Sequence, residues 1–259
     1  MKQQSKTIVF IHGLFVNDSS WNQWRTYFEA QGYKVYTPAN PGHEGDPALL
    51  RASIHPALTK TGFEDVVNNI VKLIDSLPEK PIVVGHSLAG LAVQKLIEMG
   101  KAVAGISIDG APPKNVFAPL ATIKIVLPVV NPFKGNSEFL GSREWYHKAF
   151  FNNYSKVESD QLYDQIAVPE SRKIARDTLL NSFAKIDFKK PHQPLLFIGG
   201  EKDNIFSAAF TKKIASSYKP SAGKVDYKFF EGRSHFICGE KGWEEVAAYV
   251  QNWIEGLGK

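Results

Sequence analysis

The chain has 259 residues, of which 43% are hydrophobic and 12% aromatic, a composition that supports a sizeable core and is typical of folded α/β domains rather than disordered chains. Its formal net charge is +5, but the lysines are scattered, so the basic stripe of a nucleic-acid-binding protein is missing and we expect no nucleic-acid partner. The single cysteine, Cys238, excludes an intrachain disulfide.

The N-terminal residues resemble neither a signal peptide nor a membrane anchor. Residues 1–6 lead directly into a strand-like segment, with no apolar region and no cleavage site. The most apolar later run, residues 119–133, is interrupted by Pro128 and Pro132 and carries Lys124. It is too short and too broken to cross a bilayer. We therefore expect a cytoplasmic protein without a membrane span.

Strand-like and helix-like segments alternate through the first 110 residues. The strand-like segments are short and apolar or β-branched, whereas the helical ones place apolar residues three or four positions apart. Continuous apolar strands that alternate with amphipathic helices are typical of a parallel sheet covered on both faces. The expected strands are 7–11, 34–36, 81–84 and 103–108, and the expected helices cover 21–28, 66–77 and 88–99.

This alternation stops near residue 111 and resumes near residue 190. The intervening segment begins with a proline-rich apolar stretch and continues with helical patterns, so we predict an inserted, mostly helical lid at residues 111–190. Residues 1–110 and 191–259 would then form the core. Within the lid, helices are expected at 159–166 and 170–183; after it, strands at 194–198 and 225–230 and helices around 210–218 and 243–254.

The segment Gly85-His-Ser-Leu-Ala89 lies where a predicted strand runs straight into a predicted helix. In a nucleophile elbow, the serine occupies a tight turn with positive φ that exposes its hydroxyl above the sheet. The residues two before and two after it must be small, because the helix starts almost against the strand. Gly85 and Ala89 meet this requirement. The alternative is an incidental serine in an ordinary turn, so Ser87 needs partners elsewhere in the chain.

Candidate partners follow two later strands. A serine nucleophile requires a general base, and the base requires an orienting carboxylate. Asp203 follows the strand at 194–198, and His235 follows the strand at 225–230. The chain order Ser87, Asp203, His235 is the order expected when the nucleophile lies in a strand-to-helix elbow of a parallel sheet. Asp109, at the end of the strand at 103–108, is the competing acid, and we favour Asp203.

The remaining requirement is a pair of backbone N–H groups that stabilise an oxyanion. Leu14 follows His12-Gly13 at the end of the first strand, and Leu88 begins the helix after the serine. Their N–H groups are the expected oxyanion hole. We expect His12 to hold its loop rather than contact substrate. His43, in a neighbouring loop, remains an alternative substrate contact, and Cys238 is expected to be a packed thiol.

Taken together, His12-Gly13, Gly85-His-Ser-Leu-Ala89, Gly199 to Asp203 and Gly232-Arg-Ser-His235 resemble the α/β-hydrolase superfamily, in its serine-nucleophile, esterase-like members with an inserted cap. The resemblance covers essentially the whole chain outside the lid. It implies an α/β-hydrolase fold, with a mostly parallel central sheet flanked by helices on both faces. Serine at the elbow argues against the dehalogenases and epoxide hydrolases of this superfamily, and Phe236 replaces the lysine of its hydroxynitrile lyases.

The predicted function is that of a carboxylesterase-type serine hydrolase that forms an acyl-enzyme on Ser87 and needs neither metal nor cofactor. A lactonase, a C–C bond hydrolase and a non-catalytic small-molecule binding protein remain alternatives. The substrate is expected to be a mostly apolar small ester or lactone, and the pattern leaves the oligomeric state open. The residues predicted to contact substrate are Phe15, His86, Phe117, Trp145 and Phe236.

Overall fold

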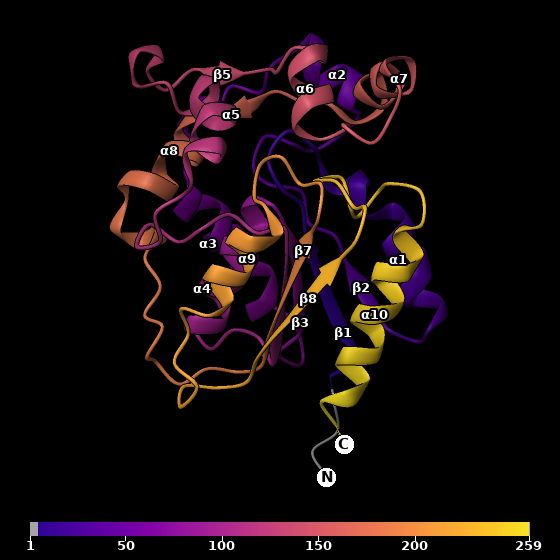
Figure 1. The fold of residues 1–259 in the computed structure, drawn as a ribbon, viewed down its shortest axis with the longest axis vertical. Coiled ribbons are helices and arrows are strands. Elements are labelled where there is room, and N and C mark those ends of the chain that lie inside the picture. The colour runs from indigo at the N-terminus through magenta and orange to yellow at the C-terminus, as the bar shows by residue number, and fades with distance from the viewer. Residues whose placement is uncertain (1–4, 259) are drawn as a thin grey trace.

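The computed structural model describes residues 5–258, and its centre is a sheet of six parallel strands in the order β2-β1-β3-β4-β7-β8 (Figure 1). The four central strands β1, β3, β4 and β7 are short, largely apolar and buried along their whole length, as a covered parallel sheet requires, whereas the edge strands β2 and β8 are partly exposed. All the neighbouring pairs are parallel, so the carboxyl ends of the strands meet along one edge. The strands are β1 (Thr7–Ile11), β2 (Lys34–Tyr36), β3 (Ile82–His86), β4 (Ala104–Ile108), β7 (Leu195–Gly200) and β8 (Val225–Phe230).

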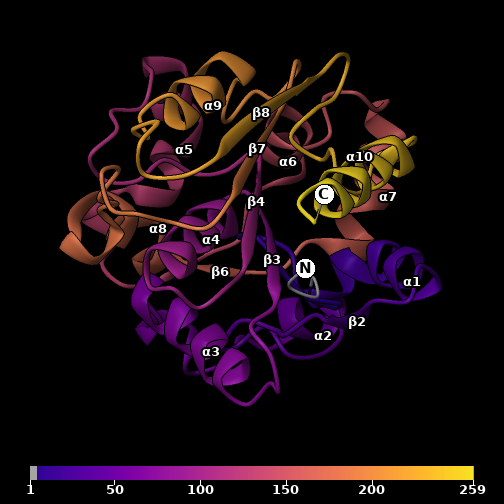
Figure 2. The same cartoon turned by 90° about the horizontal axis from the view of Figure 1, so that it is seen from below.

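Helices cover both faces of this sheet (Figure 2). Successive side chains of β1 alternate between the faces: Val9 and Ile11 pack into one apolar core, and Ile8 and Phe10 pack into the other. Helices α3, α4 and α9 cover the first core, and α1 and α10 cover the second. Their bounds are α1 Asn22–Ala30, α3 Phe63–Asp75, α4 Leu88–Glu98, α9 Ala208–Ala215 and α10 Trp243–Gly256.

A further group of elements lies above the carboxyl edge of the sheet (Figure 1), and we call it the upper layer. Except for α2, it comes from the segment predicted as a lid, and it includes a two-stranded antiparallel ribbon of β5 and β6. Its members are α2 (Pro47–Ala52), α5 (Leu120–Val130), β5 (Glu138–Phe139), α6 (Arg143–Ala149), α7 (Lys156–Ile166), β6 (Glu170–Ser171) and α8 (Arg172–Leu180). Short 3-10 helices lie at Asp18–Trp21, Leu58–Lys60, Pro132–Lys134 and Ser182–Ala184.

The strands and helices of the core agree closely with the sequence-based expectations. The strands at 7–11, 34–36 and 225–230 have the predicted bounds, and the others differ by one or two residues. The predicted helix at 170–183 is shorter, because Glu170 and Ser171 pair with β5 and the helix starts only at Arg172. Helix α2 was not predicted. It has only six residues, fewer than two turns, so it is too short to show the helical periodicity that would mark it in the sequence.

No helix within residues 5–258 combines the length and the apolar character needed to cross a bilayer.

Candidate active site

Ser87 links the end of β3 to the start of α4. Its φ is 57° and its ψ is −123°, so it occupies the left-handed region that costs a non-glycine residue roughly 1–3 kcal/mol. The surrounding backbone holds this conformation. The N–H of Ser87 donates to the carbonyl of Ile108 at 3.0 Å, and its carbonyl accepts from the N–H groups of Gly90 and Ala111, each at 2.9 Å. The strained turn therefore places the serine hydroxyl above the carboxyl edge of the sheet.

Small residues around Ser87 permit this turn. A Cβ atom on Gly85 would collide with the backbone carbonyl of Ala89, because α4 begins directly beside β3. A Cβ on Gly90 would come within 2.5 Å of the Gly110 Cα, and one on Gly13 within 2.9 Å of the Ser87 Cβ. Real Cβ contacts are not this short, so glycine is required at all three positions.

His235 and Asp203 form a continuous hydrogen-bonded chain with Ser87. The Nε2 atom of His235 lies 3.0 Å from the Ser87 Oγ, and its Nδ1 lies 2.7 Å from the Asp203 Oδ2. The other carboxylate oxygen of Asp203 accepts the N–H groups of Ile205 at 2.6 Å and Phe206 at 2.9 Å. Because an aspartate can only accept from the histidine, Nδ1 carries the proton and Nε2 is left to accept one from the serine.

Asp109, the competing acid, lies beside this chain but does not occupy the acid's place in it. Its Oδ1 accepts the N–H of Gly200 at 2.8 Å, and its Oδ2 has no hydrogen-bond partner among the described residues. Burial, and then the nearby charge of Asp203, raise the pKa of Asp109 well above its usual value. The structure therefore favours a protonated, neutral Asp109.

Leu14 and Leu88, whose backbone N–H groups are the expected oxyanion donors, line the same cavity as Ser87. Leu88 is the first residue of α4, so its N–H has no acceptor within the helix. Within residues 5–258, neither N–H donates to a backbone or side-chain acceptor. Both donors are thus available to a negatively charged oxygen, and the Leu88 donor adds the favourable field of a helix N-terminus.

The loop that carries Leu14 is held by the upper layer through Phe15. The φ of Phe15 is 70°, a second strained non-glycine position. Its carbonyl accepts from the hydroxyl of Tyr146 at 3.0 Å and from the N–H of Val168 at 3.1 Å. Its N–H points at the Oε2 of Glu170 at 3.4 Å. Both backbone groups next to the Leu14 donor are therefore fixed by residues from the segment 143–171.

Two buried histidines support the same loop and do not line the cavity. The Nδ1–H of His12 donates to the Gly13 carbonyl at 2.8 Å, and its Nε2 accepts the N–H of Asn40 at 2.9 Å. Burial lowers the pKa of His12 to about 3, so it remains neutral. His43 lies 3.2 Å from the Oε2 of Glu170. Burial alone would lower the pKa of His43, but the Glu170 carboxylate outweighs burial and raises it.

His86 forms a hydrogen bond with the backbone of His235. Its Nε2 lies 2.7 Å from the carbonyl of His235, to which it can only donate. Burial, together with the neighbouring His235, lowers the pKa of His86 to about 3. Potential ligand atoms of His86, Asp109 and His235 lie within 4.8 Å of one another. Both ring nitrogens of His235 are already engaged, however, so the three do not offer a free ligand set for a metal ion.

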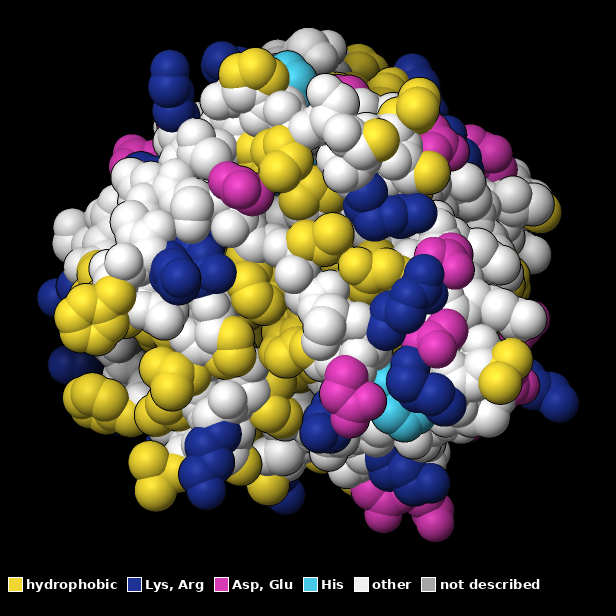
Figure 3. All heavy atoms as spheres, turned by 90° about the horizontal axis from the view of Figure 1, so that it is seen from above, with side chains coloured by type: hydrophobic (Ala, Val, Ile, Leu, Met, Phe, Trp, Pro, Cys, Tyr) yellow, Lys and Arg dark blue, Asp and Glu magenta, His cyan; other side chains and the backbone are white. Residues whose placement is uncertain are grey.

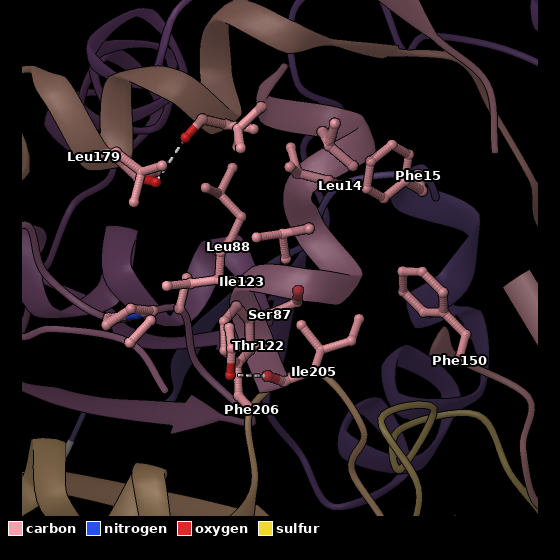
Figure 4. A pocket seen from close by; sticks show the side chains of 18 of the residues that line it. Leu14, Phe15, Ser87, Leu88, Thr122, Ile123, Phe150, Leu179, Ile205 and Phe206 are labelled. Atoms are coloured by element: carbon pink, nitrogen blue, oxygen red, sulfur yellow. Dashed lines mark hydrogen bonds between the residues drawn. The ribbon is translucent and has the colours of Figure 1, made fainter. Parts of the chain in front are cut away.

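The Ser87 hydroxyl opens into an apolar cavity between the sheet edge and the upper layer (Figure 4). The cavity measures about 130 Å³. Two other hydroxyls line it, but Thr122 donates to the Ile205 carbonyl and Thr178 to the Ala175 carbonyl. No charged side chain is among its lining residues, which are Leu14, Phe15, Ser87, Leu88, Ala111, Pro112, Ala118, Thr122, Ile123, Val126, Val129, Val130, Trp145, Phe150, Ala175, Thr178, Leu179, Ile205 and Phe206.

The side chains predicted to contact substrate fall into two groups. Phe15 and Trp145 line the cavity, with their ring centroids 4.9 Å apart. Phe117 does not line it, and its side chain is 86% exposed. His86 and Phe236 instead line a smaller cavity that also borders Cys238. Burial raises the pKa of the Cys238 thiol well above its usual value, so it is an unreactive packed group.

Comparison with known proteins agrees with this architecture. Residues 8–249 match the model of the alpha/beta hydrolase family. Comparison with curated protein sequences gave no match. Similar solved structures include a methylesterase, MES16, from Arabidopsis (19% identity, TM-score 0.70, 96% of this chain and 98% of that one) and a monoacylglycerol lipase from Paleococcus ferrophilus (18% identity, TM-score 0.66, 96% and 93%). A third is polyneuridine aldehyde esterase (16% identity, TM-score 0.65, 96% and 99%).

At these identities, the solved structures establish the fold alone. The family match is stronger evidence, because it spans nearly all of the chain and includes the serine turn and both loops that contribute to the hydrogen-bonded chain. The chain belongs to the alpha/beta hydrolase family.

Proposed function

We propose that this protein is a carboxylesterase-type serine hydrolase that forms an acyl-enzyme on Ser87. The observation that carries the proposal is the buried chain from Ser87 through His235 to Asp203, which opens into an apolar cavity flanked by two free backbone N–H groups. The names of the similar structures, a methylesterase, a lipase and an esterase, are consistent with ester substrates.

The geometry supports a two-step reaction. His235 Nε2 removes the Ser87 proton as Oγ attacks the ester carbonyl, and Asp203 holds the imidazole in the required tautomer and stabilises its positive charge. The carbonyl oxygen becomes an oxyanion that the N–H groups of Leu14 and Leu88 stabilise. His235 then protonates the departing alcohol. In the second step, His235 activates a water molecule that attacks the acyl-enzyme and releases the acid.

The cavity favours an uncharged, apolar acyl group. A charged acyl chain would lose its hydration without gaining a counter-ion, because the lining contains no ionisable side chain. The free volume suits a short to medium chain rather than a bulky ring system. We further propose that residues 111–190 act as the cap that shapes this specificity, since 13 of the 19 residues that line the cavity belong to this segment.

A panel of p-nitrophenyl esters tests the substrate class. We expect kcat/KM to rise from acetate to medium-length acyl chains and then to fall, because each added methylene buries more apolar surface until the cavity is full. An ester with a terminal carboxylate on its acyl chain should react at least tenfold more slowly than the neutral ester of equal length. Equal rates for the charged and neutral esters would contradict this assignment of the acyl site.

The hydrogen bond from the Tyr146 hydroxyl to the Phe15 carbonyl leads to a second prediction, on kcat. Replacing Tyr146 with phenylalanine removes one hydrogen bond from the loop that carries the Leu14 N–H. We expect kcat to fall about three- to tenfold with little change in KM, because a net hydrogen bond contributes roughly 1 kcal/mol and the donor acts on the transition state. Tyr163→Phe is the matched control, since the Tyr163 ring contacts Tyr146 without bonding to Phe15. A rise in KM with unchanged kcat would contradict this role.

A further inference from the structure

Helix α5, with the sequence Leu-Ala-Thr-Ile-Lys-Ile-Val-Leu-Pro-Val-Val, is apolar all round its circumference except for Thr122 and Lys124. Its inner side lines the cavity through Val126, Val129 and Val130. A helix of this kind is normally buried on every side. The outer side of α5 is nevertheless exposed: the side chain of Leu120 is 76% exposed, and those of Ile123 and Leu127 are 41% and 54% exposed.

The exposed side of α5 continues into neighbouring segments and forms what we call the apolar rim. It adjoins the cavity, because Ile123 and Leu179 belong both to the rim and to the cavity wall. In Figure 3 the apolar side chains gather around a hollow, with Lys and Arg side chains among them. Monomeric proteins rarely expose so many large apolar side chains together. The rim consists of Phe117, Leu120, Ile123, Leu127, Phe133 (95% exposed), Leu179 and Leu180.

The rim is also basic. Residues 111–142 and helix α8, which contribute the rim, together carry six Lys or Arg against two Asp or Glu, although Arg172 is buried and Lys173 is paired with Asp177. Lys124 and Lys134 are exposed and make no ion pair among the described residues. Exposed lysines interleaved with large apolar groups are typical of segments that rest on an anionic lipid surface.

We propose that the apolar rim docks on an anionic lipid surface, from which the cavity draws ester substrates directly. The docking itself is inferred from the rim alone. The supply of ester substrates to the cavity rests in addition on the proposed hydrolase function. A second copy of the chain fits less well, because a twofold interface brings each patch against itself and would place lysines opposite lysines. A protein partner seated on the rim would also close the cavity above Ser87, whereas a lipid surface leaves the cavity facing its substrates.

Flotation with vesicles of ether-linked lipids, which an esterase cannot hydrolyse, measures docking independently of catalysis. We expect the wild-type protein to float with phosphatidylcholine mixed with an equal amount of phosphatidylglycerol, and only weakly with phosphatidylcholine alone. Leu120→Ser/Phe133→Ser should bind at least tenfold more weakly, because two large exposed apolar groups are lost. Lys124→Gln/Lys134→Gln should bind the mixed vesicles about thirtyfold more weakly. High salt should weaken wild-type binding as well.

Matched controls separate this effect from general changes in charge or hydrophobicity. Val157→Ser removes an exposed apolar side chain of α7. Lys212→Gln/Lys219→Gln removes two exposed charges, one in α9 and one shortly after it. Both variants should bind the vesicles like the wild type. All variants should hydrolyse a short, soluble ester at the wild-type rate, whereas the rim variants should lose activity on a long-chain ester dispersed in the vesicles. Lack of flotation by the wild type, or equal flotation by the rim variants, would overturn the proposal.

Two further outcomes are distinguishable. A wild-type dimer in analytical ultracentrifugation that dissociates in the Leu120→Ser/Phe133→Ser variant would show that the rim binds a second copy, and would overturn the lipid assignment. Flotation with the expected dependence on the rim but no reaction of Ser87 with an active-site reagent would sustain the docking and reject the hydrolase function. Reaction of Ser87 with the reagent, but no flotation of the protein, would support the hydrolase function and reject the docking.

Discussion

Ser87→Ala is expected to lower kcat/KM for the best ester on the order of 10⁶-fold, because His235 then has no hydroxyl to activate and the acyl-enzyme cannot form. The cavity wall and the free N–H groups of Leu14 and Leu88 remain in place. Binding of a non-hydrolysable ester analogue should therefore stay within a fewfold of wild type. Steady-state kinetics and calorimetric titration measure the two effects separately.

The control is Ser107→Ala, a buried serine on the neighbouring strand β4 whose hydroxyl has no hydrogen-bond partner among the described residues. Its side chain does not line the cavity. We expect this variant to retain ester hydrolysis within about threefold, since no bond in the proposed mechanism is lost. Substantial turnover by Ser87→Ala would reject the covalent mechanism even if the fold and the cavity stood unchanged.

The second large effect distinguishes the two buried carboxyl groups. Asp203→Asn should lower kcat about 10⁴-fold, because the amide can present its N–H to His235 and so favour the wrong tautomer. Asp109→Asn should change kcat less than tenfold. The structure favours a neutral Asp109, and an amide oxygen can still accept the Gly200 N–H. The reverse ranking of the two variants would make Asp109 the catalytic acid.

The raised pKa of Asp109 should also make the stability of the folded protein depend on pH. Its pKa is raised in the folded state, so above about pH 4 the unfolded chain releases this proton while the folded chain retains it. This difference destabilises the wild-type fold progressively as the pH rises from about 4 towards the folded-state pKa. The Tm of Asp109→Asn relative to wild type should therefore be higher at pH 7 than at pH 4. A Tm difference that is independent of pH would contradict a protonated Asp109.

Much of the site was predictable because its residues lie next to strand ends. Ser87, Asp203 and His235 each follow a short apolar strand, and parallel strands bring their carboxyl ends to one edge, so the alternation of segments was enough to expect their proximity. The positive φ of Ser87 was similarly predictable, because small residues flank it at the positions where α4 would otherwise collide with β3.

Other parts of the site had no local signal. Tyr146 and Glu170 hold Phe15 across more than 130 residues of chain, and a buried tyrosine or glutamate looks like any other in a single sequence. Phe117 was expected to face the substrate because the segment around it is apolar. It is instead exposed, in the irregular stretch before α5, where an apolar run has no helical or strand period that could indicate which side chains face the cavity.

The upper layer thus does more than cover the sheet. Through Phe15 it fixes the loop that offers the Leu14 N–H, and through α5 it forms both the wall of the cavity and the exposed rim. If the proposed function is right, changes in this layer should affect kcat as well as substrate choice, because the proposed oxyanion donor and the proposed acyl site are held by the same layer.

The most direct test of the account is the intact mass of the protein after exposure to a fluorophosphonate, measured for wild type and Ser87→Ala. This reagent phosphonylates a serine only when a neighbouring base activates it. The account predicts one adduct on the wild-type chain, located to Ser87 by peptide mapping, and none on the alanine variant. A folded wild-type protein that takes up no reagent, or that carries the adduct at another residue, would contradict an activated Ser87.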